Sequence, residues 1–372
     1  RTHEPLARPQ QFWAAAPAFM YPTQTPEWST CPEMRLMVNL SFANGARGWF
    51  AYCYHNDPVW LRGMVQRTLT GPFLTFSDLW LELAQRMKRA SALSPLFLRA
   101  RAESVLEDWY TRGVTTDTTA TPAGDVTPMS QFHLRGDDFS IYMTVSNNTR
   151  EMTSVNIDIP RDVGDGTQIY DLSHYITTLN WAPLDRRRHI EMFPGQSHII
   201  LVTDPANGDR WREMIASRLI EADLKQVDYY IGLAASYGLK AADAERAIEV
   251  ARGERTADGL GKIHGAKEDF VNLLYSHPAL HEAQSALLEA SSALCACDGA
   301  LCRLMVAGKR QQAEDMGREV LPLGRELIHL RVELRAGNGA SVPQACTDLC
   351  ERSKRLLERI RDEYPKNRYH VA

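Results

Sequence analysis

The pattern of hydrophobic and polar residues divides the chain into three blocks. The first block combines the spacing that is typical of strands with the spacing that is typical of helices. Two short apolar runs, near residues 8–17 and 45–54, have the composition of strands. Each is followed by a stretch with apolar residues at helical spacing, over 32–44 and 76–92. Strand–helix–strand–helix at this spacing is typical of a parallel α/β sheet. Two such units cannot cover both faces of their own sheet, so we expect further strands upstream of Arg1.

The second block has the alternation of half-buried strands. Apolar runs recur every ~8–12 residues between turn-forming Gly, Asn, Asp and Pro residues, which predicts an antiparallel β-sandwich. In the segment 154–159, Val155, Ile157 and Ile159 are expected to point inward. The predicted strands are 131–134, 139–147, 153–159, 168–171, 189–193 and 198–203.

The third block, from about Gly208, has helical spacing almost throughout and predicts an antiparallel helical bundle. Pro322 is expected to kink or split the fifth helix. Gly259, Gly261 and Gly265 are expected to form a flexible connector. The predicted helices are 210–237, 241–253, 265–275, 278–307, 311–336 and 342–364.

The blocks together predict a multidomain protein of class α/β plus all-β plus all-α. We expect two β/α units at 1–101, a β-sandwich at 102–205 and a helical bundle at 206–372. The segment 311–335 carries a broad apolar stripe opposite a charged face, and such helices are built to pack on other helices. We therefore expect the bundle to contribute to a homodimer as well.

Composition narrows the range of partners. The 372 residues are 44% apolar and 24% charged, as in an ordinary globular protein, and the formal charge of −4 speaks against nucleic acid as a partner. No apolar run reaches the roughly 18 residues of a membrane span. There is no phosphate loop, dinucleotide fingerprint or nucleophile elbow, so we expect no cofactor.

The cysteines leave two interpretations open. Cys295 and Cys302 share one helix face, and Cys346 and Cys350 share another. Two such helices could be joined by disulfides in an oxidising compartment, or the cysteines could be small buried thiols. No CxxC pair occurs, so a zinc site is not expected, and we predict no metal. The imidazoles of the His277-Pro-Ala-Leu-His281 segment have metal-ligand spacing, but the proline favours a helix start.

Several short motifs in the first two blocks occur in an order that is known from one group of proteins. The motifs are Pro17-Ala-Phe, Pro22-Thr with Pro26-Glu, Pro32-Glu-Met-Arg, Gly45-Ala-Arg-Gly-Trp-Phe-Ala-Tyr-Cys-Tyr, Ile169-Tyr-Asp-Leu and Phe193-Pro-Gly-Gln-Ser-His-Ile-Ile-Leu-Val-Thr. In this order the first 205 residues resemble the C-terminal end of a bacterial glycoside-hydrolase-like TIM barrel, a (β/α)8 barrel, followed by its β-sandwich domain. The helical block lies outside the resemblance.

The resemblance implies a carbohydrate site, because the active site of a TIM barrel lies at the C-terminal ends of its strands. The residues that leave the last two strands would supply flat aromatic faces for sugar rings and polar groups for sugar hydroxyls. They are Asp57 as the catalytic group and Tyr21, Tyr54, His55, Asn56 and Trp60 as substrate-binding residues. Singly, each also fits a structural role, such as packing by Tyr54 or a turn at Asp57.

Glycosidases usually need two catalytic carboxylates. In the barrels that this chain resembles, they commonly lie at the ends of the fourth and seventh strands. Here the seventh strand is followed by no carboxylate until Glu27, and Glu33 suits the dipole of the next helix. An enzyme would thus be a glycoside hydrolase whose carboxylates lie mainly upstream of this chain. The alternative is a non-catalytic, degenerate barrel that binds carbohydrate or serves in surface assembly.

Both hypotheses imply the same partners and location. The ligand would be a polysaccharide or glycoconjugate, and a further barrel segment would come from the same precursor or from another chain. A protein of this kind is expected outside the cell, in the periplasm or at the cell surface.

Overall fold

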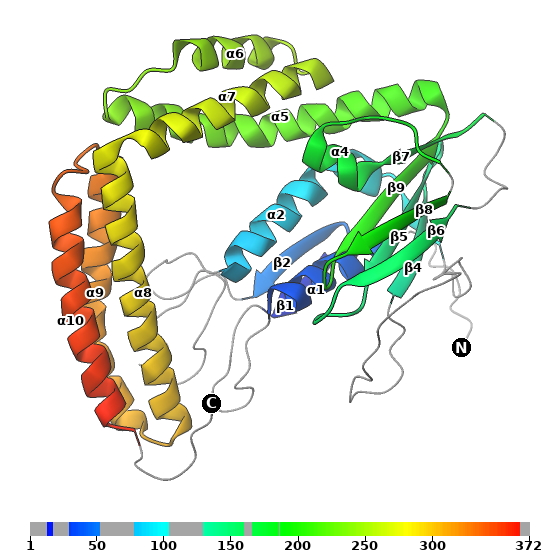
Figure 1. Ribbon diagram of the computed structural model, residues 1–372. Helices are drawn as coiled ribbons and strands as arrows, with labels where there is room; N and C mark the ends of the chain where they lie inside the picture. Colours follow the sequence, from blue (N-terminus) through cyan, green and yellow to red (C-terminus); the bar gives the residue numbers. More distant parts are fainter. Residues whose placement is uncertain are drawn as a thin grey trace.

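A computed structural model describes residues 13–17, 30–52, 78–103, 129–159, 166–185 and 187–364 (Figure 1). The described chain is of mixed type, with a parallel strand pair, an antiparallel sheet and a large helical part. The mixed α and β character is therefore as predicted, with a parallel strand pair first, antiparallel strands next and long helices last along the chain.

The first block contains a parallel β–α–β unit. Its elements are β1 (Trp13–Pro17), α1 (Cys31–Ala43), β2 (Gly48–Tyr52), α2 (Asp78–Ala92) and α3 (Ser94–Phe97). Strand β1 pairs in parallel with β2, so the predicted strand–helix–strand–helix order is confirmed. Helix α1 begins with a capping box, in which the Glu33 carboxylate accepts a hydrogen bond from the Thr30 backbone N–H at 2.8 Å.

The second block is an antiparallel sheet with a smaller sheet beside it. The elements are β3 (Arg101–Ala102), β4 (Met129–Arg135), β5 (Phe139–Ser146), β6 (Thr153–Asp158), β7 (Gln168–Asp171), α4 (Leu172–Thr178), β8 (Arg187–Met192) and β9 (Ser197–Thr203). The larger sheet has the order β3-β4-β5-β9-β7, and β6 pairs with β8. All six predicted strands are confirmed, whereas β3 and α4 were not expected.

The central strands β5 and β9 of the larger sheet are buried on both faces, which explains why nearly all of their residues are buried. On β9, Ile199 and Leu201 face helices, while Ile200 and Val202 join a second cluster with residues of β6 and β8. Val155, Ile157 and Ile159 belong to that second cluster, so their predicted inward orientation is confirmed. The two sheets thus share one apolar layer.

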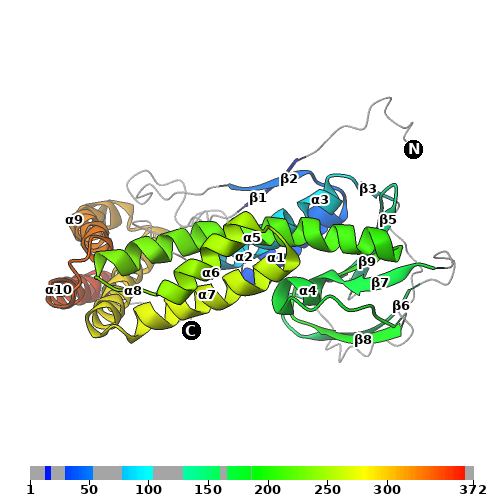
Figure 2. The same ribbon diagram turned by 90° about the horizontal axis from the view of Figure 1, so that it is seen from above.

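The third block consists of six long helices. They are α5 (Pro205–Ser236), α6 (Ala242–Gly253), α7 (Ala257–Ser276), α8 (Pro278–Val306), α9 (Arg310–Arg335) and α10 (Val342–Asp362). Each coincides with a predicted helix within a few residues, except that α7 begins earlier. Helices α5–α7 form one layer, and α8–α10 form a three-helix bundle at the end of this layer that is far from the antiparallel sheet, with its axis roughly perpendicular to α5–α7 (Figures 1 and 2).

Two details of this block differ from expectation. Helix α9 runs unbroken through Pro322, because buried Leu323 and Leu327 anchor the flanking turns and offset one missing hydrogen bond. The expected glycine connector is instead part of α7. Gly259 lies there because a Cβ at this position would meet the Glu254 carbonyl oxygen at 2.5 Å.

The helical block and the sheet share a continuous core. Trp211 of α5 is fully buried and meets the ring of Phe139 edge-on, with 4.9 Å between centroids. The guanidinium groups of Arg99 and Arg210 lie over the same indole, at 5.4 and 4.9 Å from its centroid. Helix α5 is therefore fixed to the sheet, and the predicted domain limits at 101 and 205 stay predictions.

Candidate functional site

The C-terminal edge of the β1–β2 pair is the starting point for the site predicted from the sequence. The parallel register places Pro17 opposite Tyr52, so both strands end at the same level. Pro17 and Tyr52, the last residues of the two strands, are therefore neighbours at one edge. The predicted site residues Tyr21, Tyr54, His55, Asn56, Asp57 and Trp60 themselves lie outside the described residues.

The two faces of this strand pair differ. Trp49 of β2 is buried with Met34 and Val38 of α1 and with residues of α2, so both helices cover one face. The neighbouring Phe50 points the other way and is 50% exposed. Helices therefore cover the Trp49 face of the pair, whereas Phe50 on the opposite face is half exposed.

A cluster of charged side chains joins helix α1 to helix α2. The Arg35 guanidinium donates two hydrogen bonds to the Glu82 carboxylate, at 2.8 and 2.7 Å, and Arg86 lies 2.9 Å from the same carboxylate. Burial alone would raise the pKa of Glu82, but the hydrogen bonds from Arg35 and the two positive charges outweigh it and lower the pKa. Glu82 thus stays ionised as the hub of this cluster.

The same arginine holds the turn between β8 and β9. Arg35 Nη1 donates to the Pro194 carbonyl oxygen at 2.8 Å, and Asn39 Nδ2 donates to the Gly195 carbonyl oxygen at 2.9 Å. Ser197 Oγ in turn donates to Asn39 Oδ1 at 3.0 Å. These bonds position the sheet block rigidly against the β–α–β unit, although the two are far apart in sequence.

A second polar cluster lies where β7 meets α4. The Asp171 carboxylate caps α4 by accepting from the His174 N–H at 2.8 Å, and it lies 3.3 Å from His198 Nε2 and 3.7 Å from Arg188. Burial would raise the pKa of Asp171, but these partners outweigh burial and lower it. Nearby, burial lowers the pKa of Arg89, which donates to the Ser197 carbonyl oxygen, to about 9.

Replacement of Asp171 by asparagine is expected to lower the free energy of unfolding at pH 7 by about 1–3 kcal/mol. Asparagine still caps α4 but loses the attraction to Arg188 and His198. Because the folded-state pKa of Asp171 is lowered, its stabilisation is present above the unfolded value of about 3.9 and disappears as the pH falls through the folded value. Urea unfolding of both proteins between pH 7 and about pH 3 should show the gap closing; a constant gap would contradict this assignment.

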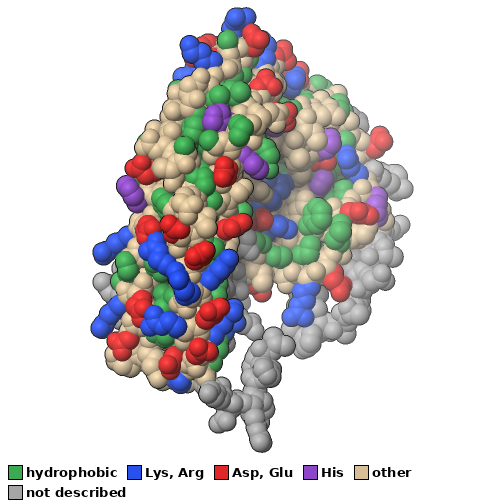
Figure 3. All heavy atoms as spheres, turned by 60° about the vertical axis from the view of Figure 1, so that its left-hand side comes forward, with side chains coloured by type: hydrophobic (Ala, Val, Ile, Leu, Met, Phe, Trp, Pro, Cys, Tyr) green, Lys and Arg blue, Asp and Glu red, His purple; other side chains and the backbone are tan. Residues whose placement is uncertain are grey.

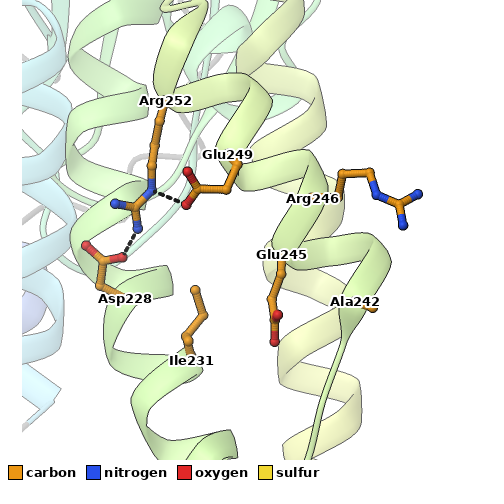
Figure 4. A pocket seen from close by; sticks show the side chains of 7 residues that line it. All are labelled: Asp228, Ile231, Ala242, Glu245, Arg246, Glu249 and Arg252. Atoms are coloured by element: carbon orange, nitrogen blue, oxygen red, sulfur yellow. Dashed lines mark hydrogen bonds and ion pairs between the residues drawn. The ribbon is translucent and has the colours of Figure 1, made fainter.

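A shallow groove lies between α5 and α6 (Figure 4). It has a volume of about 460 Å³, and Arg252 crosses it to contact Asp228 and Glu249. Another groove, of about 400 Å³, lies between α9 and α10, where Arg359 and Glu319 form a two-bond ion pair. Oppositely charged side chains intermingle over the bundle surface (Figure 3), so these grooves are solvated helix faces.

The cysteines of the bundle are thiols. Helices α8 and α10 pack together, yet Cys346 and Cys350 are free, so the alternative of disulfides between these helices is wrong. Burial raises the pKa of Cys297 to about 12 and that of Cys346 to about 11. The Cys297 Sγ donates to the Ser353 carbonyl oxygen at 3.1 Å, which makes it a packing residue.

The described part of the chain includes two features that bear on metal binding and on membranes, the His277 segment and helix α8. No three His, Cys, Asp or Glu side chains gather there as metal ligands, and His277 instead caps α8 with its Nδ1. Helix α8 is long and apolar enough to cross a membrane, but 56% of its most apolar stretch is buried, as in the core helix of a bundle.

The described polar clusters were missed in the sequence because their members are distant along the chain. Arg35 and Asp171 lie in two of the motifs that the chain shares with glycoside-hydrolase-like barrels. These motifs were the one sequence signal that pointed to either residue. Comparison of this chain with protein-family models, with curated proteins and with solved structures found no match.

Proposed function

We propose that residues 1–205 are the last two β/α units of a glycoside-hydrolase-like barrel and its β-sandwich, and that the barrel edge binds a polysaccharide or glycoconjugate. The observation that carries this proposal is the parallel register of β1 and β2, which ends both strands at one edge. Helices α1 and α2 on one face of the pair and Phe50 on the other support a barrel wall. The apolar layer shared by the two antiparallel sheets supports the sandwich.

The site would lie where the chain leaves β1 and β2. Tyr21, Tyr54 and Trp60 offer aromatic faces for sugar rings, and His55 and Asn56 offer hydrogen bonds. Asp57 is the carboxylate nearest to the end of β2 in the sequence, and we assign it the acid–base or nucleophilic role. The second carboxylate and the remaining strands would come from a barrel segment supplied by the same precursor or by another chain.

A non-catalytic barrel is the second candidate, and one observation favours it. The four residues after β1, from Ala18 to Tyr21, include no carboxylate, although a barrel glycosidase commonly has one at this strand. Such a protein would bind carbohydrate or take part in surface assembly, and the bundle α8–α10 would form a homodimer.

Replacement of Asp57 by asparagine in the complete protein tests the catalytic role. We expect a loss of hydrolysis of at least 100-fold on a panel of glycans, with retained glycan binding, because a catalytic carboxylate acts mainly in the transition state. Asp243→Asn is the matched control, since the Asp243 side chain is 96% exposed on α6. Glycan binding without hydrolysis in the wild type would select the non-catalytic candidate; neither binding nor hydrolysis would refute both.

A further inference from the structure

The outer face of the β6–β8 sheet is a surface that the barrel site does not use. The two strands form the outermost layer of the second block, on the side away from α5 (Figure 2). Every second residue points inward to the shared apolar layer, so the alternate residues point outward. These outward residues are Ser154 and Asn156 on β6 and His189 and Glu191 on β8, and exposed Met152 and Phe193 directly precede β6 and follow β8.

One end of this face is apolar. Phe193 is 59% exposed and Met152 is 52% exposed. The pair of Thr153 with Met192 ends the β6–β8 ladder, and Met152 and Phe193 are the next residues of the two chain segments at this end. The Phe193 backbone N–H donates to Gln196 Oε1 at 2.8 Å, in the same turn that Arg35 holds. The ring is therefore presented on a rigid base at little entropic cost.

The rest of the face is polar and ordered by its own hydrogen bonds. His189 Nε2 lies 2.9 Å from Ser154 Oγ, and His189 Nδ1 lies 3.0 Å from Asn156 Oδ1. These contacts fix the imidazole plane across both strands. Glu191 lies directly opposite Ser154 in the register, between the imidazole and the apolar end. Successive outward side chains on one strand are about 6.7 Å apart, so hydrogen-bonding groups follow the aromatic ring at regular intervals.

We propose that this face, Met152–Phe193 followed by Ser154, Glu191, His189 and Asn156, binds a polysaccharide chain. A sugar ring would stack on Phe193, and the hydroxyl groups of the next rings would meet the ordered polar groups. The proposal rests on the proposed function for the class of ligand, but it names a separate site. A second copy of the chain is the weaker occupant, because two exposed apolar side chains fall far short of a stable dimer interface.

Retention of the complete protein on insoluble polysaccharides tests the proposal. The probes are microcrystalline cellulose, chitin and granular starch, and depletion of the supernatant gives the affinity. We expect Phe193→Ala to weaken binding to the retaining polysaccharide about tenfold, the effect of one lost ring contact. His189→Ala should weaken it about fivefold by the loss of hydrogen bonds. Tyr275→Ala is the matched control, because Tyr275 of α7 is also an exposed ring, at 65%.

Trp60→Ala, which removes an aromatic face from the proposed barrel site, separates this proposal from the proposed function. Loss of retention in Phe193→Ala that is absent in Tyr275→Ala supports the β6–β8 face. Loss in Trp60→Ala with full retention in Phe193→Ala overturns the β6–β8 proposal and leaves the barrel site standing. Wild-type protein that none of the three polysaccharides retains, or an equal loss in Tyr275→Ala, also overturns it.

Discussion

Replacement of Glu82 by alanine is expected to lower the free energy of unfolding by about 3–5 kcal/mol. The side chain of Glu82 is only 9% exposed and is shared by Arg35 and Arg86, each 17% exposed. Without the carboxylate, two guanidinium groups remain in a poorly solvated place with no opposite charge between them. Removal of one partner from a buried pair costs much more than the pair itself contributes. Urea unfolding followed by circular dichroism at pH 7 measures the change.

Glu319→Ala provides the matched control. Glu319 also receives two hydrogen bonds from one arginine, Arg359, at 2.7 and 2.9 Å. Its side chain is 46% exposed and that of Arg359 is 57% exposed, so solvent replaces the lost contact. We expect a change of about 1 kcal/mol or less. Equal effects of the two substitutions would show that burial does not decide the strength of the Arg35–Glu82 contact.

The helices and strands were largely predictable because local periodicity determined them. The alternation from Ser154 to Ile159 required no distant information, and neither did the long helical stripes of α8–α10. The exceptions depended on tertiary packing. Pro322 lies inside a continuous helix whose buried residues Leu323 and Leu327 pack in the helical core. Gly259 lies in the first turn of α7, where an added Cβ would meet the carbonyl oxygen of Glu254. Local propensity contains neither fact.

The candidate sites were predictable to a smaller extent. The edge at which β1 and β2 end follows from their parallel pairing, which the sequence predicted. The cluster around Glu82 could not be predicted from the sequence, because Arg35 is 47 residues away and both residues look like ordinary helix-surface charges. The β6–β8 face required the register that pairs Asn156 with His189, and no pattern within either strand fixes that register.

The turn at Gly195 is where these long-range contacts converge, and Gly195→Ala is expected to lower the free energy of unfolding by about 3–5 kcal/mol. The φ angle of Gly195 is +68°, which costs alanine about 1–2 kcal/mol. A Cβ there would also lie 2.2 Å from the Pro32 carbonyl oxygen of α1. Because that oxygen belongs to the backbone of a packed helix, the turn has to move, and the hydrogen bonds from Arg35 and Asn39 are lost with it.

Gly238→Ala separates strain from the steric clash, because Gly238 has the same φ angle of +68° and no atom within 4 Å of an added Cβ. Its cost should be the strain alone, about 1–2 kcal/mol. The difference between the two variants then measures how strongly the turn holds the sheet block against α1. If both variants lose the same stability, the turn adapts without leaving α1. A larger loss for Gly195→Ala, together with faster trypsin cleavage of the native protein, would show that this contact locks the two blocks together.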